Sequence, residues 1–155
     1  MVRVTSIIRV LFGDPDESLL AAYRELLQTH FEVATEPNAL KCVRRLRQLV
    51  PDVLVLEPEL PCGGGEGVLS VMRDEPSLAD IPVMILTACR DPDVLKRVAP
   101  FPIGDYRVKP LPPAQLVTRI RRLLDHQRMR KYARDVRNRL DRWNAMRTQE
   151  PIVDY

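Results

Sequence analysis

The feature that most constrains the fold is a run of four apolar residues, Val53 to Leu56, that ends in the single carboxylate of Glu57. Turn-forming residues follow at once, with Pro58, Pro61 and the glycine cluster 63–65. A short aliphatic run between turn residues is typical of a strand that is buried on both faces. Glu57 is therefore expected at the carboxyl end of such a strand, which is the edge where open parallel sheets bind ligands.

Four further apolar runs predict strands at residues 7–12, 31–34, 82–86 and 104–108, and helical patterns lie between them. The helix near residue 92 is expected to be short, because prolines at positions 100 and 102 stop it. The helix that begins near residue 37 is expected to turn four apolar side chains inward, namely Leu40, Val43, Leu46 and Leu49.

Strand and helix thus alternate five times with short connections, which is typical of an α/β protein with a parallel sheet. We predict a flavodoxin-like, doubly wound sheet of five parallel strands in the order 2-1-3-4-5, with an extended C-terminal helix. Residues 1–125 are expected to form this domain, and residues 126–155 a basic helical extension and tail.

Composition excludes several other classes of protein. The 155 residues allow one domain with a short appendage. No apolar run approaches the ~18–20 residues of a membrane span, and the N-terminus does not read as a signal peptide. Cys42, Cys62 and Cys89 are odd in number and far apart, which fits neither a disulfide framework nor a zinc site. These features indicate a cytoplasmic protein with reduced thiols, and no membrane partner is expected.

Polar side chains follow four of the predicted strands. Asp14 follows the first strand, Glu57 the third, Thr87 the fourth and Lys109 the fifth. In the order 2-1-3-4-5, strands one, three and four are neighbours, so their carboxyl ends converge on one pocket. Neither histidine sits at a strand end, so no catalytic triad can be assembled and enzymatic activity is not expected.

Three short motifs give this arrangement a family resemblance: Leu86-Thr87-Ala88, the stretch from Asp105 to Pro110, and Pro61 with Gly65 after the strand-three acid. In this order and at this spacing they resemble the receiver domain (CheY-like) of bacterial two-component response regulators, over roughly residues 6–125.

In that family, a histidine kinase phosphorylates an aspartate at the position of Glu57, and an acid pair after the first strand holds magnesium. The resemblance implies that Thr87 and Lys109 would grip the phosphoryl oxygens and that Tyr106 would be the aromatic residue that changes rotamer. Asp14 matches the first acid of the metal-binding pair.

The sequence departs from the family pattern at two positions. Glu57 replaces the phosphoacceptor aspartate, and Pro15 replaces the second acid, which leaves Asp14 and Asp16 as candidate magnesium ligands. The extra methylene moves the carboxylate roughly 1.5 Å outward, which upsets in-line attack on a phosphoryl donor. The same shift brings it within reach of Lys109 and Thr87. We expect no cofactor, with weak Mg²⁺ binding as the alternative.

These departures predict a stand-alone signalling adaptor that acts by protein–protein contact with other signalling proteins. In this interpretation the chain is a pseudo-receiver, and Glu57 is either a fixed substitute for the phosphorylated state or a relic. Two alternatives stay open: a working phosphoreceiver of a histidine kinase phosphorelay, and a nucleic-acid-associated regulator that acts through the basic C-terminal helix.

The segment 126–148 differs from the rest of the chain. It carries eight bases against two acids, so its net charge is +6, while the remainder of the +3 chain sums to −3. Without glycine or proline up to residue 147, it favours a helix that continues from about residue 112. Five residues at three- and four-residue steps form an apolar stripe, namely Met129, Tyr132, Val136, Leu140 and Trp143. The stripe needs burial by a second copy of the chain, by a partner or by the domain itself, and non-specific nucleic-acid contact by the arginines is the rival hypothesis.

Overall fold

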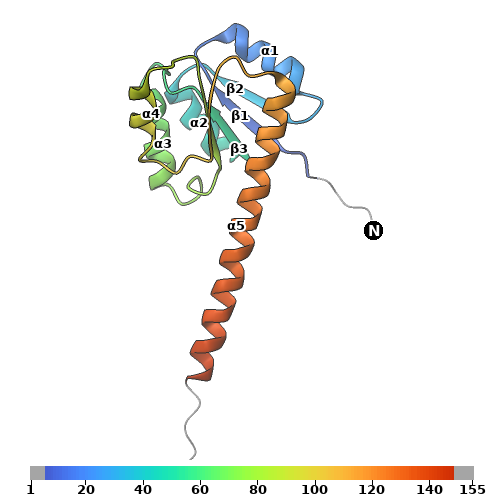
Figure 1. Ribbon diagram of the computed structural model, residues 1–155, viewed down its shortest axis with the longest axis vertical. Coiled ribbons are helices and arrows are strands. Elements are labelled where there is room, and N and C mark those ends of the chain that lie inside the picture. Colours follow the sequence, from blue (N-terminus) through green and yellow to red (C-terminus); the bar gives the residue numbers. More distant parts are fainter. Residues whose placement is uncertain (1–5, 149–155) are drawn as a thin grey trace, which may run out of the picture. The chain divides into compact units, whose positions relative to one another are not determined.

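The computed structural model describes residues 6–148 and contains one sheet of five parallel strands (Figure 1). The strands are β1 (Arg9–Gly13), β2 (Glu32–Glu36), β3 (Val53–Leu56), β4 (Val83–Thr87) and β5 (Asp105–Val108). Their order in the sheet is β2-β1-β3-β4-β5, as predicted. The C-terminal residues 150–155, to which the sequence assigned no role, lie outside the described residues.

Five helices connect and follow these strands: α1 (Glu17–Leu27), α2 (Ala39–Leu49), α3 (Gly64–Asp74), α4 (Pro92–Val98) and α5 (Pro113–Arg147). Local chemistry fixes where several of them begin. The Asp16 side chain accepts from the backbone N–H of Leu19 at the start of α1, and Asn38 does the same for Lys41 at the start of α2. As expected from the prolines, α4 is only seven residues long.

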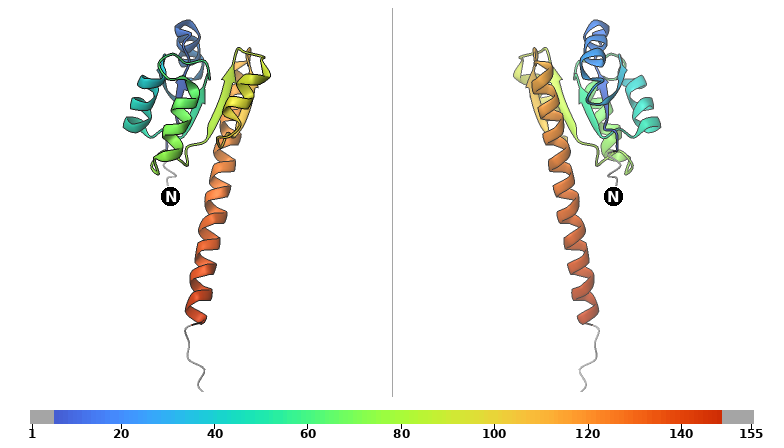
Figure 2. Two further views of the ribbon diagram at one scale, coloured as in Figure 1. Left: turned by 90° about the vertical axis from the view of Figure 1, so that its left-hand side faces the viewer. Right: turned by 90° about the vertical axis from the view of Figure 1, so that its right-hand side faces the viewer.

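The helices cover both faces of the sheet, so the central strands are buried on both sides (Figures 1 and 2). Val53 and Val55 face the layer of α1 and α5, while Leu54 and Leu56 face α2, α3 and α4. The first layer buries Leu20, Tyr23, Leu27, Leu116, Ile120, Leu123 and Leu124. The second buries Ala39, Cys42, Leu46, Val68, Leu69, Met72 and Val98.

One prediction about α2 is wrong. Leu40 does not face the core but is 70% exposed, whereas Cys42 is fully buried in its place. Ala39, Cys42 and Leu46 form the face that packs on the sheet, which rotates Leu40 away from it. Burial also raises the pKa of the Cys42 thiol to about 12, with a smaller contribution from Glu36.

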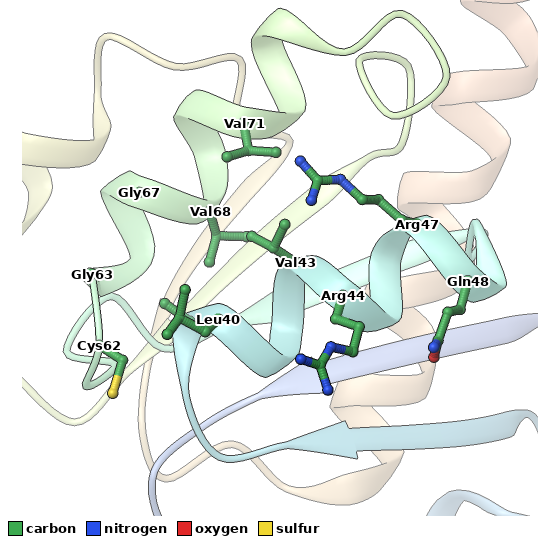
Figure 3. A pocket seen from close by; sticks show the side chains of 11 residues that line it. Leu40, Val43, Arg44, Arg47, Gln48, Cys62, Gly63, Gly67, Val68 and Val71 are labelled. Carbon is green, nitrogen blue, oxygen red and sulfur yellow. The ribbon is translucent and has the colours of Figure 1, made fainter.

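Two apolar residues of α2 line a groove of about 650 Å³ against α3 (Figure 3). Leu40 and Val43 line it from α2, and Val68 and Val71 from α3. Part of its wall on the α3 side is bare backbone at Gly67, where an added methyl group would meet no atom within 4 Å. Leu40 is therefore turned toward this groove, while Val43 also packs partly against the core cluster beneath the helix.

Helix α5 is continuous from Pro113 to Arg147, in agreement with the prediction of one extended helix (Figure 2). By its internal contacts the chain divides into two compact units, with the boundary between Leu124 and Asp125. Among residues 6–148, no helix is both long and apolar enough to cross a membrane.

The loop after β3 depends on a close approach between two backbones. The N–H of Gly65 donates to the carbonyl of Pro58 at 2.9 Å. A Cβ at Gly65 would stand 2.8 Å from the Cα of Pro58, which is closer than real Cβ atoms come to backbone. Only glycine therefore fits where α3 begins beside the end of β3.

We predict that Gly65→Ala lowers the free energy of unfolding by about 1–3 kcal/mol, the usual cost of overpacking. Gly67→Ala is the matched control, because the same methyl group at position 67 of the same helix meets open space. It should raise stability by up to about 1 kcal/mol through helix propensity. Urea unfolding of both variants checks this, and equal midpoints would contradict the packing argument.

Candidate functional site

Four polar side chains from four strand ends meet at the carboxyl edge of the sheet. Asp14 follows β1, Glu57 follows β3, Thr87 is the last residue of β4 and Lys109 follows β5. Asp14 is 5% exposed, Glu57 4% and Thr87 not at all. The structure thus brings together the residues predicted from the ends of the strands. Asp14, Glu57 and Lys109 line a hollow of about 550 Å³, together with Pro15, Glu59 and Cys89.

The carboxylate of Glu57 is saturated with hydrogen-bond donors. Its Oε1 accepts from the Thr87 hydroxyl at 2.8 Å and from the backbone N–H of Glu59 at 3.2 Å. Its Oε2 accepts from the backbone N–H of Ala88 at 2.9 Å and from the Lys109 ammonium at 3.1 Å. A carboxylate has about four lone-pair sites, so all of them are in use.

The Thr87 hydroxyl is oriented by a second contact. Its Oγ1 accepts from the backbone N–H of Cys89 at 3.0 Å, so its own proton is directed toward Glu57. This contact joins the turn after β4 to the acid after β3.

Lys109 lies between two carboxylates. Its ammonium donates to Oδ2 of Asp14 and to Oε2 of Glu57. Burial by itself lowers the pKa of Lys109, but the hydrogen bonds and negative charges of Asp14 and Glu57 outweigh burial and raise the pKa above its ordinary 10.5. The amine is therefore charged at neutral pH, and it compensates two acids that are almost completely removed from water.

The residues at the metal position do not fit a magnesium ion. Pro15 offers no side-chain ligand, and Oδ1 of Asp16 caps α1. Oδ1 of Asp14 accepts from the backbone N–H of Asp16, while Oδ2 accepts from Lys109. Within residues 6–148, no group of three or more acidic, histidine or cysteine side chains is placed to hold a metal. A cation is already supplied here, and it is the lysine.

Tyr106, the predicted switch aromatic, is half-buried on β5 and packs against the core cluster beneath α2, α3 and α4. It also lines a second hollow with Leu95, Ala99 and Phe101. Burial raises the pKa of its phenol, with smaller contributions from Cys89 and Glu57.

The sequence did not reveal two parts of the site. The contact between Lys109 and Asp14 bridges residues 95 positions apart, and no local pattern marks it. The backbone donors of Glu59 and Ala88 carry no side-chain signature. The predicted stripe residues of the C-terminal segment belong to the unit that begins at Asp125.

We predict that Lys109→Met lowers the free energy of unfolding by about 3 kcal/mol at pH 7, because two buried carboxylates lose their counter-charge. The raised pKa fixes the pH dependence. The contribution of Lys109 is fully present below its ordinary pKa of 10.5 and is lost as pH rises through the raised value. The difference between wild type and variant should therefore shrink in strongly alkaline solution.

Lys96→Met is the matched control for this prediction. Lys96 pairs with Asp93 at 3.4 Å, but both side chains are about three-quarters exposed. Its loss should cost less than about 1 kcal/mol. Denaturant unfolding across pH measures both variants, and an equally small effect of the two would show that Lys109 does not hold the site.

Comparison with known proteins points to one family. The chain matches the family model described as the response regulator receiver domain over residues 10–121. It is 37% identical over 119 residues to the transcriptional regulatory protein PrrA of Mycobacterium tuberculosis, covering 75% of this chain and 49% of that protein. It is 32% identical over 123 residues to the probable transcriptional regulator ycf27 of Galdieria sulphuraria, covering 75% and 45%. The chain thus spans about half the length of these curated relatives.

Solved structures share the fold. The chemotaxis response regulator CheY4 of Vibrio cholerae superposes with a TM-score of 0.70 at 21% identity, covering 77% of this chain and all of that one. A CheY-like receiver domain protein of Methanospirillum hungatei gives a TM-score of 0.74 at 19% identity, covering 81% and 99%. Because the family model matches most of this chain, the chain belongs to the family of response regulator receiver domains.

Proposed function

We propose that this receiver keeps one signalling conformation without being phosphorylated, with the Glu57 carboxylate standing in for a phosphoryl group. The observation that carries the proposal is the donor set of Glu57. In the receiver family the threonine and lysine that match Thr87 and Lys109 grip the phosphoryl oxygens. Here both groups hold the side chain of Glu57 itself.

The same donor set argues against phosphorylation of Glu57. A carboxylate that attacks a phosphoryl donor needs a free lone pair and an in-line approach. All lone-pair sites of Glu57 accept hydrogen bonds, and attack would require loss of at least one charge-assisted contact in a buried site. The metal position also argues against phosphorylation, because the carboxylate of Asp14 already accepts from Lys109 and from a backbone N–H group.

On this proposal the protein acts by contact with other signalling proteins and not as an enzyme. Its curated relatives include transcriptional regulators and, at 25% identity, the sensor histidine kinase TmoS of Ectopseudomonas mendocina. A partner that reads the conformation would meet the short helix α4, whose Leu95 is 46% exposed beside the half-buried Tyr106. Because α4 is only seven residues long, it would favour a partner whose surface is complementary to a short helix.

The test compares wild type with the double variant Glu57→Asp, Pro15→Asp, which restores both acids of the family pattern. With acetyl phosphate and Mg²⁺, we expect the double variant to acquire a hydroxylamine-labile phosphate and the wild type to acquire none. Intact-mass spectrometry measures both.

Amide NMR spectra then separate a fixed active-like state from a relic. Adding fluoroberyllate and Mg²⁺ to the double variant should move the signals of Ala88, Tyr106 and Lys109 toward their wild-type positions. Phosphate on wild-type Glu57 would refute the proposal, and shifts away from the wild-type positions would favour a relic.

A further inference from the structure

The apolar stripe of the C-terminal unit is the largest feature that the receiver site does not explain. Its members, defined here as the tail stripe, are Met129, Tyr132, Val136, Leu140 and Trp143. Each is exposed, from 36% for Val136 to 68% for Met129. The burial of the receiver core does not continue into it, since the buried residues of α5 end at Leu124.

We propose that two copies of this chain associate through the tail stripe as an antiparallel pair of helices, with a two-fold axis at Val136. This inference is independent of the state of Glu57, because all of its residues lie in the unit that begins at Asp125.

The spacing of the stripe fits an antiparallel pair. From Asp125 through the five stripe residues to Arg147 the steps are four, three, four, four, three and four, which read the same in both directions. The average of about 3.7 residues per turn keeps these residues on one line of a nearly straight helix. A two-fold axis at Val136 therefore sets Met129 opposite Trp143 and Tyr132 opposite Leu140 in both halves.

Residue sizes support the same axis. Val136 is the smallest and least exposed of the five, so the helices can approach most closely where it meets its own copy. The long Met129 side chain then meets the large indole of Trp143, which suits the polarizable thioether. The segment from Asp125 to Arg147 is about 33 Å long, room for a continuous seam.

Charge at the two ends selects the antiparallel direction. On the same face of the helix, the acid Asp125 precedes the tail stripe and the base Arg147 follows it. Both residues are exposed. The Arg147 guanidinium already lies over the Trp143 ring, with its Cζ 4.7 Å from the ring centroid. An antiparallel pair sets Asp125 of each copy opposite Arg147 of the other, whereas a parallel pair would set acid against acid and base against base.

A further polar pair, Asp135 with Arg139, fits the same arrangement. Asp135, close to the axis, lies on the same side of the helix as Arg139, four residues further on. The two-fold axis brings Asp135 of one copy near Arg139 of the other, so each acid gains an opposite charge across the seam.

Net charge opposes the association and makes it dependent on salt. Each copy carries +6 over residues 126–148. Raising salt from about 0.1 M to about 1 M shortens the Debye length from about 10 Å to about 3 Å, so association should strengthen. Nucleic-acid binding by the same arginines would respond in the opposite way, weakening steeply with salt.

Disulfide trapping in the full chain tests the direction and the register. The exposed Cys62 and the half-exposed Cys89 are first changed to serine, while the fully buried Cys42 is kept. We expect Val136→Cys to cross-link to itself. Trp143→Cys should not link to itself but should link to Met129→Cys when the two variants are mixed. Asn138→Cys, on the polar face of the same helix, is the matched control and should stay unlinked.

Light scattering of the full chain measures the association itself. The wild type should give twice the chain mass at high micromolar concentration, more completely at high salt. Asp125→Arg or Arg147→Asp alone should weaken association about tenfold, because symmetry places two such pairs in each dimer. The double swap Asp125→Arg, Arg147→Asp should restore it.

Three outcomes would overturn the proposal. They are a monomer at all concentrations and salts, Trp143→Cys cross-linking to itself as readily as Val136→Cys, and a double swap that associates no better than the single changes.

Discussion

The receiver site depends on one buried cation. The ammonium of Lys109 is held between Asp14 and Glu57, and so it ties together the ends of β1, β3 and β5. Two nearly buried carboxylates would be costly without it, because their hydrogen bonds to hydroxyl and N–H groups supply no compensating charge. Lys109 therefore supplies the positive charge that compensates both buried acids, while the pairing of the strands keeps their ends together.

The glutamate makes this arrangement self-contained. Its carboxylate collects a hydroxyl, an ammonium and two backbone N–H groups from β3, β4 and β5 and the turns after them. A site that awaits an external ligand keeps some of its donors unpaired or bound to water. Here a side chain of the chain itself satisfies them, so the ends of the strands are joined in the resting protein.

Much of this could be predicted from the sequence, because a parallel sheet places all carboxyl ends at one edge. The strand Val53–Leu56 was predicted to the residue, since turn residues and a charge bound it on both sides. The orientation of α2 was not, because Leu40 and Cys42 both fit a helical spacing and only packing decides between them. The contact between Lys109 and Asp14 was missed for a similar reason. It depends on how far a lysine reaches across the width of the sheet, and spacing along the chain does not record that distance.

The hydrogen-bonded carboxylate of Glu57 has a consequence for timing. A phosphorylated aspartate is a temporary state, and its hydrolysis sets how long a signal lasts. The side chain of glutamate is joined by carbon–carbon bonds and does not decay. On the proposed function, the signal from this protein would begin with its synthesis and end with its degradation. Its strength would follow the number of molecules in the cell rather than the activity of a kinase.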